Sequence, residues 1–408
     1  MATDRQLNIA LAMSSFFPNV GGAQVTANNL GRYLTSRGHR VVLLASRKYW
    51  KALGEQKKDF PFKILPMFPG AQSALPRIPS FYLNIQDLYL GYLQRKYKFD
   101  LWQSFGAYPT GVSIGHFTSK RKIPHVVRTV GYDVQKSERI GYGYRLNPVL
   151  DSQIKRWMPE ASSAIALTRS VVPDLREVGV PERRITIVPC GVNFDRFNSA
   201  EFDRGEVRDA YGIPRDIFAF VTVGRNHPKK GFPILLEALS ETKKREPTLQ
   251  FHCAFIGRDM DKLEPMVKSL GLTDQVTLVG EVGSSREDEA YEVPSSPLIR
   301  LYRSMDACVF PSLLEAHSHI NIEAMAAGLP VISTNAPGVR DTVDDGVDGL
   351  LAEANNPSSL ADKMIEIQKS TKLRENLVKH GLDSARLKYD WSIVGKQFED
   401  LYLELTER

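Results

Sequence analysis

The chain has 408 residues, of which 42% are apolar and 25% are charged. This composition excludes wholesale disorder and is typical of a globular protein of about two domains. Its three cysteines are odd in number and far apart, so the sequence predicts no disulfide framework and favours a reducing compartment. The first strongly apolar run, residues 7–13, is too short to span a membrane, and no later run approaches the roughly 18 residues required.

The net charge of +6 is divided unevenly between the two halves of the chain. Residues 1–190 carry 27 basic and 12 acidic side chains, whereas residues 191–408 carry 26 basic and 35 acidic ones. The basic half is expected to attract anions such as nucleic acid, an anionic membrane leaflet or a phosphorylated substrate. Scattered, solvated lysines and arginines would explain the same excess without any partner.

Short apolar runs alternate with longer amphipathic stretches along the whole chain. In the first half, a helix is expected over residues 23–37, and strands are expected at residues 7–13, 41–45, 64–66, 125–130, 163–168 and 185–188. In the second half, helices are expected at residues 232–245, 261–270 and 320–327, and strands at residues 217–223, 251–256, 276–279, 307–310 and 330–334. This alternation predicts an α/β fold of two Rossmann-like domains, with the ligand site in the cleft between them.

Three segments depart from this alternation. Residues 66–79 contain four prolines and are expected to form an irregular loop. Residues 81–98 have helical spacing, many aromatic side chains and a basic end. This helix is interpreted either as an ordinary amphipathic helix that covers a sheet or as an interfacial helix on anionic lipid. The acidic, polar stretch at residues 283–297 predicts an exposed loop.

Two glutamates follow the strand expected at residues 307–310. Glu315 is predicted in the loop after this strand, and Glu323 about one turn into the next helix. The free N–H groups at that helix N-terminus would favour a phosphate, and a carboxylate beside it can accept two hydrogen bonds from a ribose diol. In the alternative interpretation, Glu315 caps its own helix and Glu323 is solvated. The spacing of His317, His319 and Glu323 also allows a metal site, although a phosphate site explains the same residues.

Two further loops carry residues suited to binding phosphate. Arg225 and Lys230 follow the strand expected at residues 217–223, where two cations would neutralise a diphosphate as it leaves. A basic surface turn is the simpler alternative. Gly21 and Gly22 follow the first strand and would let the backbone approach a ligand closely. This loop is not a GxGxxG motif and lacks the acidic residue that a dinucleotide ribose needs, which argues against a dehydrogenase.

In this order, the motifs resemble those of the retaining nucleotide-sugar glycosyltransferases of family GT4, which have the GT-B fold. The resemblance covers nearly the whole chain and is carried by Gly21–Gly22, residues 179–197, 224–231, 256–257, 323–332 and 338–349, and the pair Glu315 and Glu323. It implies two Rossmann-like domains facing across a deep cleft, with a C-terminal helix that crosses back to the first domain. The implied acceptor-binding domain comprises residues 1–192 joined by the helix 389–408, and the nucleotide-sugar-binding domain comprises residues 193–388.

The resemblance also implies roles for individual residues. Arg225 and Lys230 would bind the donor diphosphate, Glu323 would hold the ribose hydroxyls, and Glu315 would contact the transferred sugar or the phosphates. Of these, Arg225, Lys230 and Glu315 are the expected catalytic residues. The other expected donor contacts are Gly22, Gly224, Gly257, His317, Ser318 and His319. No metal and no cofactor would be needed, since the nucleotide-sugar is the co-substrate.

Two positions depart from the family pattern. Between the two glutamates the family usually has Gly-Phe-Gly, where this chain has Ala316, His317 and Ser318. Many members also carry a histidine close to the transferred sugar, in the region where this chain has residues 130–132. Arg128 or Asp133 is expected to contact the sugar or the acceptor in its place.

The expected activity is therefore that of a metal-independent hexosyltransferase (EC 2.4) in polysaccharide, cell-surface glycan or glycolipid assembly. A UDP-sugar is the favoured donor, and a GDP-sugar is the alternative. The basic first half favours a lipid-linked or other anionic acceptor and a cytoplasmic protein peripheral at the inner face of the membrane. The alternatives are a sugar-nucleotide epimerase, a glycoside phosphorylase or a non-catalytic nucleotide-binding homologue. No aromatic-interleaved basic motif is present, so nucleic acid is not an expected partner.

Overall fold

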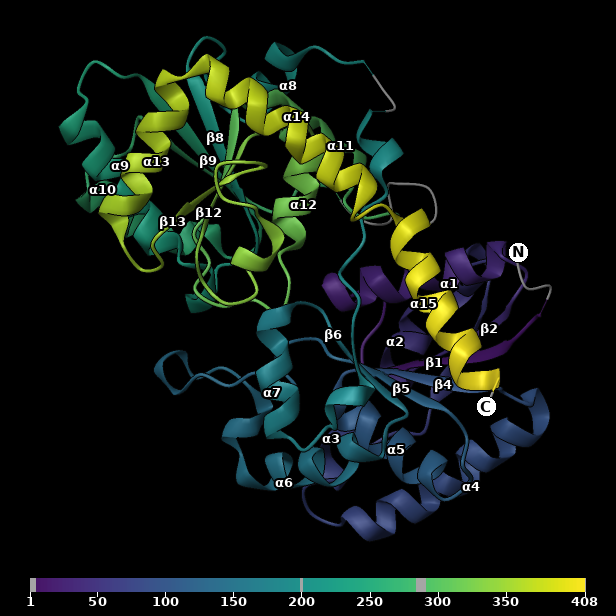
Figure 1. Cartoon of the computed structure of the whole chain (residues 1–408). Helices are drawn as coiled ribbons and strands as arrows, with labels where there is room; N and C mark the ends of the chain where they lie inside the picture. The colour runs from purple at the N-terminus through teal and green to yellow at the C-terminus, as the bar shows by residue number, and fades with distance from the viewer. Residues whose placement is uncertain (1–4, 199–200, 284–290, 408) are drawn as a thin grey trace. The chain divides into compact units, whose positions relative to one another are not determined.

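The computed structural model describes residues 5–198, 201–283 and 291–407 and divides the chain into two compact units. Unit 1 consists of Met1–Cys190 and Trp391–Arg408, and unit 2 consists of Gly191–Asp390. Each unit is built on one parallel sheet flanked by helices (Figure 1). Residues 284–290, seven of the fifteen residues of the polar stretch expected to be an exposed loop, lie outside the described residues. In the described remainder Tyr291 and Ser295 are buried and a helix begins at Ser296, so that part is not an exposed loop.

The sheet of unit 1 has seven parallel strands in the order β3-β2-β1-β4-β5-β6-β7. Its strands are β1 (Asn8–Met13), β2 (Arg40–Ser46), β3 (Lys63–Met67), β4 (Leu101–Phe105), β5 (His125–Arg128), β6 (Ser163–Ala166) and β7 (Ile185–Ile187). Its helices are α1 (Gly22–Ser36), α2 (Arg47–Ala52), α3 (Ala71–Ala74), α4 (Pro79–Tyr97), α5 (Val112–Ser119), α6 (Pro148–Trp157), α7 (Val172–Glu177) and α15 (Trp391–Glu407). Because parallel crossovers are right-handed, the reversal of strand order between β1 and β4 places helices on both faces.

The sheet of unit 2 repeats this topology with six parallel strands in the order β10-β9-β8-β11-β12-β13. Its strands are β8 (Phe218–Val223), β9 (Phe251–Ile256), β10 (Val276–Val279), β11 (Ala307–Phe310), β12 (Val331–Thr334) and β13 (Leu350–Ala352). Its helices are α8 (Arg204–Ala210), α9 (Phe232–Arg245), α10 (Glu264–Ser269), α11 (Ser296–Ser304), α12 (His319–Ala326), α13 (Pro357–Lys369) and α14 (Thr371–Leu387). The predicted pair of Rossmann-like sheets is confirmed.

Each strand expected from the sequence is present within two residues of its predicted ends, but β4 and β13 were not predicted. β4 is a central strand and is completely buried, yet it contains two polar residues, Gln103 and Ser104. Gln103 accepts a hydrogen bond from the Tyr402 hydroxyl, and Ser104 Oγ lies 3.0 Å from Nε2 of the buried His125. These two polar side chains, each with a buried partner elsewhere in the chain, interrupted the apolar run that would have indicated a strand.

Prolines account for two further differences. The proline-rich segment expected to be irregular has Pro66 inside β3 and Pro79 as the first residue of α4. β3 is an edge strand, where a missing N–H is tolerated, and the first position of a helix needs no donor. The helix expected at residues 261–270 is instead a 3₁₀ turn (Met260–Leu263) followed by α10, because Pro265 cannot continue the earlier hydrogen-bond ladder.

The C-terminal helix α15 belongs to unit 1 and packs against α1. Its buried Glu399 accepts a hydrogen bond from the Tyr33 hydroxyl at 3.1 Å and lies 3.3 Å from Arg37 Nε and 3.1 Å from His39 Nε2. Burial and the nearby carboxylate of Glu399 raise the pKa of Tyr33 to about 12. The end of the chain is thus fastened to the first unit. Across the described residues, no helix combines the length and the apolar character needed to cross a membrane.

Gly395 gives a test of this docking, because a Cβ added there would lie 2.5 Å from the Tyr33 ring. Alanine favours a helix interior by about 1 kcal/mol over glycine. We nevertheless expect Gly395→Ala to lower the Tm measured by calorimetry, since the overlap must be relieved by moving α15 or Tyr33. Gly91 in α4 is the matched control, because its added Cβ would meet atoms only at 4.0 Å and Gly91→Ala should keep or raise the Tm. An unchanged or higher Tm for Gly395→Ala would contradict the packing.

Candidate functional site

A carboxylate held between two ammonium groups forms the centre of the site in unit 2. Lys229 and Lys230 lie in the 3₁₀ turn Pro228–Lys230 after β8, and Glu315 lies in the loop after β11. Lys229 Nζ is 2.7 Å from Glu315 Oε2, and Lys230 Nζ is 2.7 Å from Oε1. Ser312 Oγ lies 3.1 Å from Oε1, and its single proton is shared between this oxygen and the Lys229 carbonyl oxygen at 2.9 Å. The carboxyl ends of β8 and β11 therefore meet in one charged cluster.

This cluster carries more positive than negative charge. Burial raises the pKa of Glu315, but the charges of Lys230 and Lys229 outweigh this effect and lower it to about 2. Burial lowers the pKa of Lys230, and the Glu315 carboxylate opposes that shift. Arg225 is exposed in the same loop and adds a third cation. Three cations against one carboxylate create a positive potential that an anionic ligand would neutralise.

Backbone contacts hold the three loops of the site together. The Leu313 N–H and the Ser312 hydroxyl both donate to the Lys229 carbonyl, at 2.7 and 2.9 Å. The Glu315 N–H donates to the carbonyl of Pro337, which follows β12, at 3.0 Å. The position of Glu315 is therefore fixed from both neighbouring loops and not by its ion pairs alone.

Two glycines permit these close approaches. Gly231 and Gly338 have φ values of 68° and 74°, in the left-handed region that favours glycine. A Cβ on Gly231 would lie 2.1 Å from the Pro311 carbonyl oxygen, and one on Gly338 would lie 1.8 Å from the Glu315 carbonyl oxygen. Any larger residue at either position would push the lysines and Glu315 apart.

Ser318, and not Glu315, caps α12. Ser318 Oγ accepts a hydrogen bond from the Asn321 N–H at 3.2 Å, so the interpretation of Glu315 as a helix cap is wrong. His317 is buried, its ring centroid lies 6.2 Å from that of His319, and its Nδ1 has no hydrogen-bond partner among the described residues. His317 and Ser318 therefore lie between the ion-paired Glu315 and α12, and His319 is the first residue of that helix.

Glu323 lies on α12 and is held by a buried tyrosine. The hydroxyl of Tyr302 on α11 donates to Glu323 Oε2 at 3.2 Å. Burial raises the pKa of Glu323, whereas the charge of His319, the hydrogen bond from Tyr302 and the charge of Lys230 act in the opposite direction. Glu323 is consequently not a freely solvated side chain, and it lies within electrostatic reach of Lys230.

Gly224 and Gly257 directly follow β8 and β9 at the same edge of the sheet. The Gly224 N–H donates to the Ile256 carbonyl at 2.9 Å, and the Gly257 N–H donates to the Val279 carbonyl at 3.1 Å. The side chain of Lys230 passes beside Gly224, where an added Cβ would meet its methylene carbons at 3.6 and 3.8 Å. The predicted donor contacts of unit 2 thus gather at the carboxyl ends of its strands.

Sequence reasoning missed two residues of this arrangement. Lys229 binds Glu315 as closely as Lys230 does, but only Lys230 was predicted. The signal was available, since two consecutive lysines stand before Gly231 in the sequence. Tyr302 gave no comparable signal, because a tyrosine on the buried face of an amphipathic helix is equally typical of a core residue.

In unit 1, the predicted glycines lie at a helix N-terminus and the predicted arginine lies at a strand end. Gly21 is the N-cap of α1 and Gly22 is its first residue. Arg128 is the last residue of β5 and is buried; its Nη2 donates to Cys190 Sγ at 3.2 Å. Its Nε has no hydrogen-bond partner among the described residues. Arg128 thus retains one donor that no described protein group uses.

Asp133 fastens two loops of unit 1 to each other. It is fully buried, and its Oδ2 accepts the Ala107 N–H at 2.6 Å while its Oδ1 accepts the Val130 N–H at 3.0 Å. Burial raises its pKa, and these backbone hydrogen bonds act in the opposite direction. Ala107 follows β4 and Val130 follows β5, so Asp133 sets the separation of the two strand ends.

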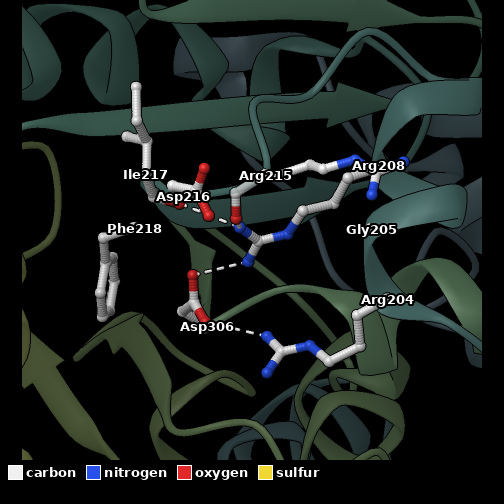
Figure 2. A pocket seen from close by; sticks show the side chains of 8 residues that line it. All are labelled: Arg204, Gly205, Arg208, Arg215, Asp216, Ile217, Phe218 and Asp306. Carbon is white, nitrogen blue, oxygen red and sulfur yellow. Dashed lines mark hydrogen bonds and ion pairs between the residues drawn. The ribbon is translucent and has the colours of Figure 1, made fainter.

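A surface pocket of about 370 Å³ in unit 2 lies elsewhere, beside the amino ends of β8 and β11. Figure 2 shows Arg204 and Arg208 converging on Asp306, with Nη2 to carboxylate distances of 2.9 and 2.7 Å. Arg208 also donates to the Ser304 carbonyl at 2.8 Å. These guanidinium groups fasten α8 to the sheet, and the pocket is at the edge opposite to the charged cluster.

No group of three or more His, Cys, Asp and Glu residues within the described part of the chain is arranged to hold a metal ion. The metal interpretation of His317, His319 and Glu323 therefore finds no support in their geometry.

Two family profiles match the chain. "Glycosyltransferase Family 4" matches residues 20–196, and "Glycosyl transferases group 1" matches residues 203–383. The first match falls almost wholly within unit 1 and the second falls within unit 2.

Among curated proteins, the chain is similar to D-inositol 3-phosphate glycosyltransferase of Actinosynnema mirum, with 30% identity over 212 residues. The match covers 50% of this chain and 48% of that protein, so the chain spans about half the length of this relative.

Among solved structures, a glycosyltransferase from Rickettsia africae has a TM-score of 0.78 at 19% identity and covers 98% of both chains. Anabaena Alr3699/HepE, solved in complex with UDP and glucose, has a TM-score of 0.74 at 17% identity and covers 98% of this chain and 100% of that one. At this identity the likeness shows the fold, and the family profiles show the relationship. The chain therefore belongs to the family 4 glycosyltransferases and has the GT-B fold.

Proposed function

We propose that the protein is a retaining glycosyltransferase (EC 2.4) that moves a hexosyl group from a nucleoside-diphosphate sugar to an acceptor. The observation that carries this proposal is the Lys229–Glu315–Lys230 cluster, whose surplus positive charge lies within reach of the carboxylate of Glu323. UDP is the favoured nucleotide, because HepE of the same fold has been solved with UDP, and GDP is the alternative.

Arg225 and Lys230 are proposed to bind the donor diphosphate and to stabilise its charge as the glycosidic bond breaks. Fixed cations aimed at a leaving group supply the stabilisation that a metal ion gives other transferases, so no metal is required. Glu323 accepts hydrogen bonds from the ribose hydroxyls, and Tyr302 fixes the orientation of its carboxylate. Gly224, Gly257, His317, Ser318 and His319 complete the donor contacts of unit 2.

Lys229 is proposed to keep Glu315 paired when the donor binds. The ammonium group of Lys230 cannot keep its close ion pair with Glu315 and at the same time form an equally close one with an incoming diphosphate. A buried carboxylate that loses its only partner costs about 3–5 kcal/mol. Because Lys229 occupies the other carboxylate oxygen, Lys230 can turn to the phosphates without leaving Glu315 unpaired. Glu315 then remains ionised and faces the transferred sugar.

Unit 1 is proposed to bind the acceptor, and Gly22, the first residue of α1, is proposed as a further donor contact. Arg128, with its unused Nε donor, is the better candidate to replace the usual histidine, whereas Asp133 positions the surrounding loops. The charge balance of +15 over residues 1–190 favours a lipid-linked or other anionic acceptor. We place the enzyme in the cytoplasm, peripheral at the inner face of the membrane, in cell-surface glycan, polysaccharide or glycolipid assembly.

Thermal unfolding with UDP, GDP, ADP and their sugar conjugates tests the donor site. A ligand at 100 times its Kd stabilises the folded state by about 2.7 kcal/mol. We expect one of these nucleotides to stabilise the native chain by this amount at that concentration. Arg225→Ala and Glu323→Ala should abolish the shift. Lys379→Ala and Glu375→Ala, two exposed positions on α14, are the matched controls and should retain it. If no nucleotide stabilises the native chain at millimolar concentration, the donor site is wrong.

Replacing each lysine separately tests the division of roles. Lys230→Met should lower kcat for transfer by about 10²–10³-fold, as the loss of a preorganised charge does elsewhere. Lys229→Met should cost less, but Glu315 then has one cation fewer and its pKa rises from about 2. Since Glu315 must be ionised, the acidic limb of the pH–rate profile should move to higher pH.

Lys379→Met provides the control for these two variants, because the residue is exposed on α14. An acidic limb that is identical in the native chain and in Lys229→Met would refute the role of Lys229. Nucleotide binding without any transfer in the native chain would favour the non-catalytic alternative.

A further inference from the structure

Helix α4 of unit 1 exposes an apolar stripe along one side. Five apolar side chains spaced three and four residues apart form this α4 stripe: Ile78, Phe81, Ile85, Leu88 and Tyr92. Phe81 is 65% exposed, Leu88 75% and Tyr92 51%. The other side of the helix packs Leu90 and Leu93 into the core of the unit. α4 is thus apolar on its buried side and on much of its exposed side.

An exposed stripe of this kind is not an ordinary surface. Single exposed apolar side chains need no explanation, whereas several that are contiguous on one helix mark an interaction surface. The stripe is not the side by which α4 packs on unit 1, because Leu90 and Leu93 on its other side belong to the hydrophobic core and the helix also contacts α5. The α4 stripe therefore indicates a surface that binds another molecule or a membrane.

A basic rim surrounds the α4 stripe. Exposed basic residues stand at both ends of the helix, at Arg77 and at Arg95, Lys96 and Lys98, and on the neighbouring α5 terminus at Lys120, Arg121 and Lys122. The only acidic residue of α4, Asp87, is buried and lies 2.9 Å from His116 Nδ1. It also pairs with Lys120 at 3.3 Å and Arg121 at 3.5 Å, so the positive charge of the rim rests mainly on the basic residues at the two ends of α4. The surface is therefore apolar in the middle and positively charged at its margins, without an exposed carboxylate on the helix.

The α4 stripe begins at the functional edge of the unit. α4 follows β3, so its first turn is at the carboxyl edge of the sheet, where β1 leads into Gly22 and β5 ends at Arg128. In Figure 1, α4 runs along the outside of unit 1 beside α5. A surface that docked along α4 would therefore lie next to the side of unit 1 proposed for the acceptor.

We propose that the α4 stripe docks unit 1 on an anionic lipid bilayer. Phe81, Leu88 and Tyr92 insert at the level of the headgroups, and Arg95 and Lys96 pair with lipid phosphates. Charge complementarity selects this occupant, because a second copy of the chain would bring two basic rims together. The inference extends the membrane association included in the proposed function, and it is measured without donor or acceptor.

Cosedimentation of the full chain with lipid vesicles tests the proposal. Binding to vesicles with about one third phosphatidylserine should be at least about tenfold tighter than binding to pure phosphatidylcholine, and it should weaken with salt. Phe81→Ser/Leu88→Ser/Tyr92→Ser and, separately, Arg95→Glu/Lys96→Glu should each weaken it by at least about tenfold. The control variant, Val149→Ser/Ile187→Ser/Leu387→Ser, changes three exposed apolar side chains elsewhere and should bind like the native chain.

The native chain binding both vesicle types equally or neither of them would overturn the proposal, as would undiminished binding by the α4 triple variant. A dimer of the native chain that the α4 triple variant converts to a monomer would assign the stripe to self-association instead. Thermal shifts with UDP should be the same in all four proteins. If the native chain binds anionic vesicles but shows no thermal shift with UDP, the proposed donor site is wrong and the docking surface stands. If it shows the thermal shift but does not bind the vesicles, the docking surface is wrong and the donor site stands.

Discussion

The ion-paired carboxylate of Glu315 determines how the donor half of the molecule is assembled. A buried carboxylate must be paired, and here each oxygen takes one lysine from the loop after β8. The same loop is tied by backbone hydrogen bonds to the loop after β11, and Glu315 is tied to the loop after β12. The ion pairs of Glu315 and these backbone hydrogen bonds therefore hold three strand ends in one arrangement. Because one lysine would suffice to neutralise it, the second gives the cluster a net positive charge that would suit an anionic ligand.

Glu315 and Glu323 are both desolvated by burial, but their pKa values are shifted in opposite directions. Desolvation raises the pKa of both side chains, but two ammonium groups reverse the effect at Glu315, whereas Glu323 has a tyrosine hydroxyl and only more distant charges. The result is one carboxylate that stays ionised over the whole physiological range and another whose proton affinity is increased. Carboxylates in one site with opposite shifts commonly have different roles. Here the ionised one would face the sugar, and the hydrogen-bonded one the ribose.

Periodicity predicted most strands of both sheets, but the sequence analysis did not predict β13 or the helices α13 and α14. It also failed where a polar side chain is paired with a residue far along the chain. The parallel sheets followed from alternating apolar runs, and the donor edge followed from residues directly after those runs. β4 was missed because Gln103 and Ser104 look like loop residues until Tyr402 and His125 are seen beside them. Lys229 was missed because its importance rests on its distance to Glu315, and neighbouring residues in a loop do not reveal which of them turns inward.

The charge composition of the two units could not decide whether α4 only covers the sheet or also binds lipid. It also could not decide whether the loop with Arg225 and Lys230 binds phosphate or is a basic surface turn. Unit 2 lies in the acidic part of the chain, yet its functional edge is positive, because the cations there converge on a single carboxylate. Unit 1 is basic overall, and the one acid of α4, Asp87, is buried beside His116 and paired with Lys120 and Arg121, so the exposed charges on α4 itself are all positive. In both units it is the burial of one acidic side chain, and not the sum of charges, that decides which ligand the surface can attract.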